Sequence, residues 1–180
     1  MAGGLLCAAH AFAVATVNKS SDGSSAVISI PVVINNPKPT CDISVRSSYE
    51  LGTLRIGGDT RHDPFSVTVS CSGAVKSALK ATLTGWGTTL LPDNYRVAVS
   101  VNGQTRSSVS GPFFWLLDNV GNPIKFTDRD RDRDRDTDAF CTGTGQNRTC
   151  HITPVTRVNP DSLRGGRGTV DVVFNVIYPA

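Results

Sequence analysis

The chain has 180 residues, of which 39% are hydrophobic and 18% are charged, and its formal net charge is +3. These values fit one ordinary globular domain and exclude a large multidomain enzyme, a disordered protein and a coiled coil. Charged residues fall below the usual share of roughly one quarter, whereas Ser, Thr, Val and Gly are abundant, so the composition favours β-strands. The positive charge is not gathered in a Lys/Arg cluster, which argues against nucleic acid as a partner.

An apolar, alanine-rich segment runs from Leu5 to Val17. It offers two small-x-small sites, Ala9-His10-Ala11 and Ala11-Phe12-Ala13, which are typical of the end of a secretory signal peptide. We therefore expect residues 1–13 to be a signal peptide and the mature protein to be exported. No Lys or Arg precedes the apolar run, which leaves open a start upstream of Met1 or, as the alternative, an ordinary apolar N-terminus.

The rest of the sequence alternates polar and apolar residues in short bursts and never sustains the 3.6-residue repeat of a long helix. Turn signals separate the bursts, and Asn102-Gly103 is the clearest hairpin signal because both residues tolerate positive φ. Seven or eight short strands at this spacing predict an all-β sandwich. The expected strands are Ala26–Ile34, Cys41–Val45, Tyr49–Ile56, Phe65–Cys71, Leu79–Thr84, Tyr95–Val101, Phe113–Leu117 and Thr169–Tyr178.

The first and last of these strands alternate most clearly. Pro31 cannot donate a hydrogen bond to a sheet, so the first suits an edge or a separate extended arm, although it could also be an ordinary first strand of the sandwich. In the last strand one face is apolar and must find a core. The alternating residues are Ala26, Ile28, Ile30, Val32 and Ile34 in the first strand, and Val170, Val172, Phe174, Val176 and Tyr178 in the last.

Five cysteines are present, and Cys7 lies inside the expected signal peptide. The other four allow three disulfide pairings, and an exported chain meets an oxidising environment that favours disulfides over free thiols. We expect Cys41 to pair with Cys71 and Cys141 with Cys150. Zinc bound by Cys141, Cys150 and His151 is the alternative, but the spacing is not that of a zinc finger and no fourth ligand is evident.

The two terminal strands and the cysteines between them resemble the subunits of chaperone-usher pili, particularly minor subunits of type 1-like fimbriae. Cys41 to Arg46 looks like the first-strand cysteine motif, and Leu51-Gly52-Thr53-Leu54 looks like the Leu-Gly-x-Leu element that follows it. The run from Phe65 to Cys71 resembles the strand that brings the disulfide partner. Gly168 and the alternating run to Tyr178 look like the terminal pilin strand.

The resemblance implies an immunoglobulin-like sandwich that lacks its seventh strand and exposes an apolar groove. A periplasmic pilus chaperone first fills the groove. At the outer-membrane usher, the N-terminal arm of a neighbouring pilin subunit then replaces the chaperone strand. On this reading the alternating residues of Ala26–Ile34 donate, and the last strand, from Gly168 to Tyr178, lines the groove.

Three features depart from the family pattern. The arm has no glycine between Ala26 and Ile34, Pro179 rather than an aromatic residue is penultimate, and a charged insertion with a second cysteine pair spans about 128–150. The expected organisation is therefore a signal peptide at 1–13, an N-terminal extension at 14–36 that carries the donor strand, and a pilin domain at 37–180.

Other motifs are weaker. Asp128 to Asp136 alternates Asp and Arg, but it lacks the Gly and the terminal Glu of a calcium loop, so a solvated loop is expected. His62 and His151 have no Gly-x-Ser-x-Gly partner, so a serine hydrolase is disfavoured. Phe113–Leu117 reads as a strand buried on both faces, and Trp86, between two glycines, is a candidate recognition residue in a turn.

Together these observations predict a non-enzymatic pilus subunit, without metal or cofactor, that is exported through the periplasm to the cell surface and supports adhesion. The host receptor is unknown. One alternative is the pilin domain of a truncated tip adhesin, which receives a strand and donates none. Another is a self-contained secreted immunoglobulin-like binding module whose terminal strands pair within one chain. A secreted hydrolase is the third.

Overall fold

The computed structural model describes residues 16–19, 26–29, 39–85, 87–104, 110–127, 138–162 and 165–179. The chain divides into two units, Met1–Lys38 and Pro39–Ala180. In the first unit, β1 (Thr16–Lys19) pairs antiparallel with β2 (Ala26–Ser29). In the part of the chain that is described, no helix has the length and hydrophobicity needed to cross a membrane.

The larger sheet of the second unit is antiparallel throughout, and its centre is the long strand β12 (Asn147–Val158). The first half of β12 pairs with β5 (Phe65–Cys71), and its second half pairs with β9 (Phe113–Leu117) and β4 (Gly57–Arg61). Beyond β5 lies β3 (Cys41–Val45), and beyond β9 lie β8 (Val97–Val99) and β7 (Thr88–Leu90).

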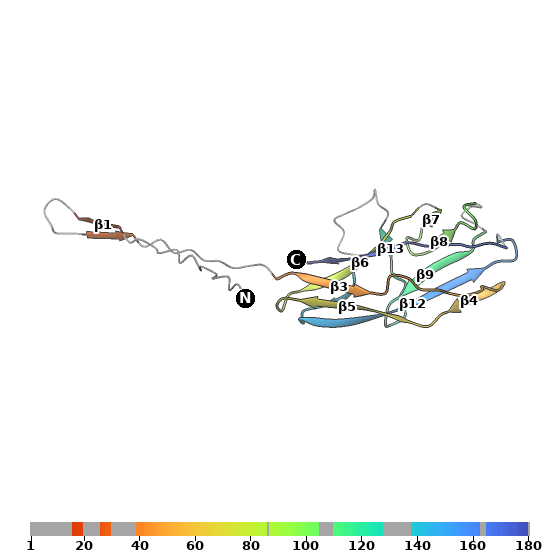
Figure 1. The fold of residues 1–180 in the computed structure, drawn as a ribbon, viewed down its shortest axis with the longest axis horizontal. Helices are drawn as coiled ribbons and strands as arrows, with labels where there is room; N and C mark the ends of the chain where they lie inside the picture. The colour runs from red at the N-terminus through yellow and green to blue at the C-terminus, as the bar shows by residue number, and fades with distance from the viewer. Residues whose placement is uncertain are drawn as a thin grey trace, which may run out of the picture. The chain divides into compact units, whose positions relative to one another are not determined.

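The smaller sheet is built around β6 (Ser77–Leu83). It pairs antiparallel with β13 (Val172–Ile177) and β11 (Phe140–Gly143), and in parallel with β10 (Phe126–Thr127). Figure 1 shows β6 and β13 in one layer and β3, β5 and β12 in the other. The second unit is therefore a β-sandwich, which is the fold class that the alternating pattern predicts.

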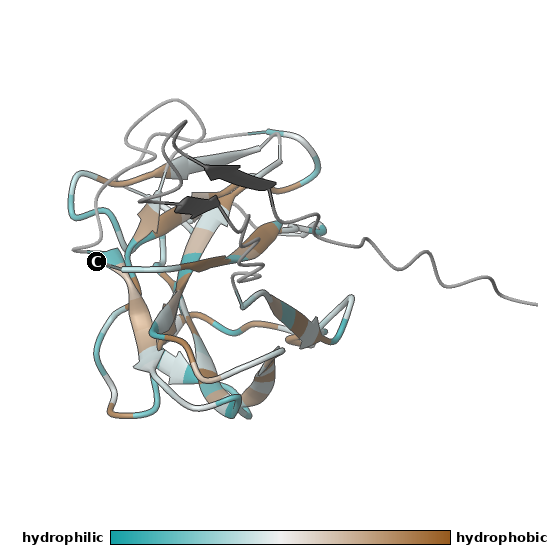
Figure 2. Ribbon diagram, turned by 90° about the vertical axis from the view of Figure 1, so that its left-hand side faces the viewer, coloured by the Kyte–Doolittle hydropathy of each residue, from teal (hydrophilic) through white to brown (hydrophobic). Residues whose placement is uncertain are grey.

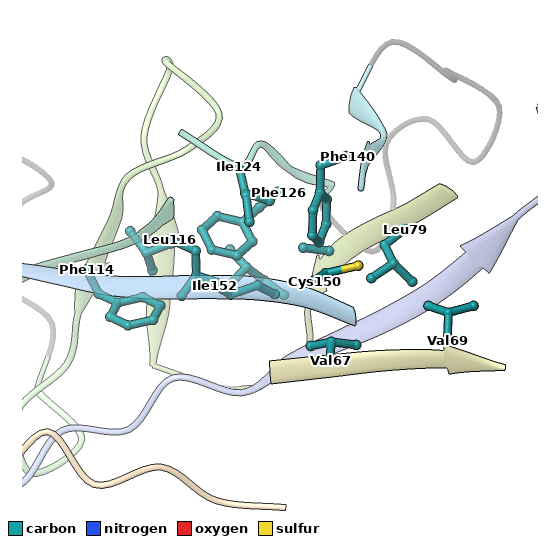
Figure 3. Packing of buried hydrophobic residues seen from close by; sticks show 13 residues of the cluster. Val67, Val69, Leu79, Phe114, Leu116, Ile124, Phe126, Phe140, Cys150 and Ile152 are labelled. Atoms are coloured by element: carbon teal, nitrogen blue, oxygen red, sulfur yellow. The ribbon is translucent and has the colours of Figure 1, made fainter. Parts of the chain in front are cut away.

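The main core lies between the two sheets. In Figure 3 the side chains of Val67 and Val69 on β5 point toward Leu79 on β6 and Cys150 on β12. Hydrophobic segments, coloured brown in Figure 2, lie mainly on the strands of the sandwich. A second cluster, which includes Trp115, covers the opposite face of β9, and all five residues of β9 are buried. This confirms the expectation of a strand buried on both faces.

Three expected strands, at Cys41–Val45, Phe65–Cys71 and Phe113–Leu117, have the predicted bounds. The strand expected at Tyr49–Ile56 is wrong, because the strand forms directly after it, at Gly57–Arg61, which begins with two glycines. Pairing with β12 overrides the low strand propensity of those glycines.

Neither β12 nor β11 was predicted from the sequence. In β12, Arg148 stands at an inward position and Pro154 interrupts the run, so the apolar alternation is hidden. Residues 140–143 and 147–150, which lie within the expected charged insertion, belong to strands of the sandwich.

The predicted hairpin turn at Asn102-Gly103 is confirmed. Asn102 has a φ of 52° and Gly103 a φ of 75°, and Val101 and Gln104 on either side form an antiparallel bridge. Two successive positive φ angles are the backbone conformation of a type I′ turn, which Asn-Gly adopts readily.

The turn between β7 and β8 is held by Asp93. Its carboxylate accepts hydrogen bonds from the backbone N–H groups of Tyr95 and Arg96 at 3.2 and 3.0 Å, and from Arg96 Nε at 2.5 Å. Desolvation opposes ionisation, but these hydrogen bonds outweigh it together and lower the pKa of Asp93 below its ordinary value. The ionised carboxylate therefore stabilises the folded state.

Asp93→Ala is expected to lower the free energy of unfolding at pH 7 by about 1.5–3 kcal/mol, because it removes hydrogen bonds to a charged group. A carboxyl group whose folded pKa is lowered loses its stabilising effect as the pH falls through that folded pKa. Urea denaturation of wild type and variant, from pH 7 down through the folded pKa of Asp93, should show that the difference in the free energy of unfolding shrinks toward acid pH. A difference that stays constant with pH would assign the effect to packing instead.

Candidate strand-binding site

Among the strand edges of the second unit that have no partner strand in the described residues, those of β3 and β13 lie next to each other. β3 pairs with β5 on one side only, and β13 pairs with β6 on one side only. Figure 1 shows the end of β13 beside the start of β3, where the backbone N–H of Cys41 donates to the hydroxyl of Tyr178 at 2.9 Å. The sandwich therefore has free backbone groups along two neighbouring edges. We call this place the β3/β13 opening.

Apolar side chains at the opening are only half buried. Along β13, Val172, Phe174 and Val176 point inward, whereas Val173 and Asn175 are exposed on the outer face. The Phe174 ring lies 6.2 Å from the ring of Phe65 and 6.2 Å from the ring of Phe140, measured between centroids. The half-buried residues that pack against the main core near these edges include Ile43, Leu51, Phe65, Val170, Val172, Phe174 and Val176.

Both expected disulfides are present. Cys41 and Cys71 are directly opposite in the β3–β5 ladder, so this disulfide fixes the start of β3 to the end of β5. Cys141 and Cys150 join β11 to β12. The zinc alternative is wrong, because both of its cysteine sulfurs are used in that disulfide.

Arg148 lies between the two disulfides. Its Nε donates to the carbonyl of Cys141 at 2.9 Å and its Nη1 to Ser77 Oγ at 2.7 Å. Ser77 Oγ in turn lies 3.9 Å from Cys41 Sγ and 4.0 Å from Cys71 Sγ. Burial lowers the pKa of the Arg148 guanidinium, and Nη2 has no hydrogen-bond partner among the described residues. The polar end of the core is therefore organised around one arginine, whose buried position the sequence pattern did not predict.

The residues expected to line the groove fall into three groups. Val172, Phe174 and Val176 are in β13, Gly168 and Val170 precede it, and Tyr178 follows it. The strand is thus shorter than the predicted Thr169–Tyr178. At Gly168 an added Cβ would lie 2.9 Å from Val99 Cγ1 and 3.0 Å from the carbonyl oxygen of Ser100, so the chain passes β8 too closely for a side chain.

The residues expected to donate lie in the first unit. Ala26 and Ile28 belong to β2, where they pair with Lys19 and Val17 of β1. Ile30, Val32 and Ile34 lie outside the described residues, as do Trp86 and the Asp-Arg run at 128–136.

The histidines do not form a catalytic site with the other described residues. His62 Nε2 lies 2.8 Å from Thr156 Oγ1, whereas His151 Nδ1 lies 3.2 Å from Ser66 Oγ. Ser66 and His151 are opposite each other in the β5–β12 ladder and their hydrogen bond is exposed. The pair is an ordinary cross-strand contact.

The described residues also contain no group of three or more His, Cys, Asp or Glu side chains that could hold a metal ion.

Part of the opening was not anticipated as a site. Ile43 and Phe65 belong to the two cysteine-strand motifs and Leu51 to the Leu-Gly-x-Leu element, but the sequence did not predict that they line the groove. For Ile43 and Phe65, the period-two alternation of β3 and β5 is the signal that could have placed them there, whereas Leu51 lies outside the strands.

A comparison with one solved structure agrees with this fold. A chain in the structure of a chaperone-usher pilus, described as revealing the molecular basis of rod uncoiling, superposes with a TM-score of 0.50 at 14% sequence identity, covering 83% of this chain and 95% of that one. The P pilus rod subunit PapA gives a TM-score of 0.49 at 16% identity, covering 77% and 99%.

No protein-family model matches the chain, and no curated protein matches its sequence. The strand topology and the likeness to the chain of the chaperone-usher pilus show that the second unit has the all-β, immunoglobulin-like pilin fold, as the sequence motifs implied.

Proposed function

We propose that this protein is a subunit of a chaperone-usher pilus and that the β3/β13 opening receives an extended strand from another protein. The observation that carries this proposal is the pair of unpaired edges with half-buried apolar side chains between them. A strand added there gains backbone hydrogen bonds on both sides and covers the apolar residues, which is strand addition to an open sheet. Left uncovered, such edges favour aggregation.

The partner strand comes first from a periplasmic pilus chaperone and then, at the outer-membrane usher, from a neighbouring pilin subunit. In the chain itself, Ala26–Ile34 has the alternating apolar pattern of a donor strand. Burying its five inward side chains contributes a gross of about 8–15 kcal/mol before ordering costs. Because β2 pairs with β1, donation requires the β1–β2 hairpin to open. The assembled subunit lies in a surface fimbrium that supports adhesion.

The pairing of β13 with β6 alone, among the described strands, favours a pilus subunit over a self-contained immunoglobulin-like module. A tip-adhesin pilin domain has the same opening and differs only in donating no strand. The two are separated by whether the N-terminal arm of one molecule can complement another.

The test is periplasmic expression of the full chain with and without a pilus chaperone, followed by addition of a synthetic peptide of residues 24–35. We expect aggregation or degradation without the chaperone, and a soluble, stable complex when either the chaperone or the peptide is present, because only then is the opening covered. A stable monomer without either would reject the proposed function. A peptide carrying Ile28→Asp is the matched control, and it should fail to stabilise the protein because it would bury a charge.

A further inference from the structure

The strand ladders determine which backbone groups face the β3/β13 opening. Ser72 N–H donates to the carbonyl of Thr40 at 2.9 Å, so the backbone of Thr40 faces β5. Hydrogen-bonding direction alternates along an antiparallel strand, and the backbone groups of Cys41, Ile43 and Val45 therefore face the opening. On the other edge, Thr84 N–H donates to Asp171 O at 3.0 Å, so the backbone of Asp171 faces β6. By the same alternation, the backbone groups of Val172, Phe174 and Val176 in β13 face the opening.

One of these edge positions is already occupied. The N–H of Cys41 donates to the Tyr178 hydroxyl, so this donor is not free for an incoming strand. Tyr178 continues the inward series of Val172, Phe174 and Val176, and its side chain remains 49% exposed. The hydroxyl can therefore be removed by mutation without opening a buried cavity.

We propose that Tyr178 is the end-stop of the opening, a positioning residue that prevents an incoming strand from pairing with Cys41 and so fixes its register. This role rests on the proposed function. The incoming strand pairs with Ile43 and Val45 on β3, and its residues beyond Tyr178 stay outside the opening. A shift by two residues would keep the same side chains facing inward, so the apolar alternation alone cannot set the register. A residue that blocks one end of the opening can set the register of the incoming strand.

The test uses the full-length protein, Tyr178→Phe, Tyr178→Ala, and the peptide of residues 24–35 with two residues removed from either end. Tyr49→Phe is the matched control, because it also removes a hydroxyl bonded to the backbone, here to Asp63 O at 2.6 Å. In wild type and in Tyr49→Phe, shortening the end of the peptide that faces Tyr178 should change Kd less than twofold. In Tyr178→Phe and Tyr178→Ala the same truncation should weaken binding about fivefold, because the peptide now bonds to Cys41.

Hydrogen exchange at the Cys41 amide gives a second readout. In wild type we expect equal protection with and without peptide. In both Tyr178 variants exchange should be fast in the free protein and slow in the complex. Increased protection of Cys41 in wild type on peptide binding, or identical truncation profiles in all proteins, would overturn the end-stop. Failure of wild type and every variant to bind any peptide would instead reject the proposed function, and the end-stop with it.

Discussion

Replacing Val172 with aspartate is expected to weaken binding of the 24–35 peptide at least about 100-fold, because the added strand would enclose an unpaired charge in an apolar site. Val172 is half buried at an inward position of β13 and packs against the main core. In the free protein the carboxylate can still reach water. Binding removes that water, so the cost falls mainly on the complex. Fluorescence polarisation with a labelled peptide measures the change.

Val173→Asp provides the matched control. Val173 is the next residue of the same strand, but it is 42% exposed and faces away from the core. We expect its Kd to stay within twofold of wild type. Circular dichroism should show that both variants are folded. Equal loss of binding in the two variants would mean that β13 is not the edge that receives the strand.

Removing the Cys41–Cys71 disulfide by double serine substitution should lower the free energy of unfolding by about 3–4 kcal/mol, from the loop entropy of a cross-link with this separation. The two cysteines are 30 residues apart in sequence. Because this disulfide also holds β3 at the edge of the opening, peptide binding should weaken in the same variant. Guanidinium denaturation and the polarisation assay measure the two effects.

The Cys141–Cys150 disulfide is the internal comparison. Its cysteines are 9 residues apart, and the expected loss is smaller, about 2.5–3 kcal/mol. It joins β11 to β12 and does not hold β3 or β13, so peptide binding to the folded protein should change less than in the Cys41/Cys71 variant. A larger loss of stability for this pair than for Cys41 and Cys71 would contradict the loop-entropy account.

The strands predicted best from the sequence are those whose pattern of apolar residues is local and uninterrupted. Phe65–Cys71 alternates apolar and polar residues, and Phe113–Leu117 is uniformly apolar, so both were located to the residue. Gly57–Arg61 became a strand only through its ladder with β12. No local pattern reports such a contact, since the partner is far away in sequence.

The candidate site was predictable in part for the same reason. The inward residues of β13 follow from period-two alternation, and the cysteine pair marks the start of β3. The hydrogen bond between Tyr178 and Cys41 joins residues 137 positions apart, and no spacing rule anticipates it. Arg148 was missed because a lone arginine in a polar stretch indicates an exposed side chain, whereas here it reaches Ser77 inside the sandwich.

Under the proposed function, in which an N-terminal arm holds the subunit in a fibre, the position of the Cys41–Cys71 disulfide has a mechanical consequence. Tension on the arm enters β3 at its first residue and would otherwise unzip β3 from β5 one hydrogen bond at a time. Cys41 is opposite Cys71 at that first position, so the pull passes through a covalent bond directly to β5. The remaining β3–β5 ladder is shielded from the load, and rupture must begin elsewhere in the sandwich or at the strand exchanged between subunits.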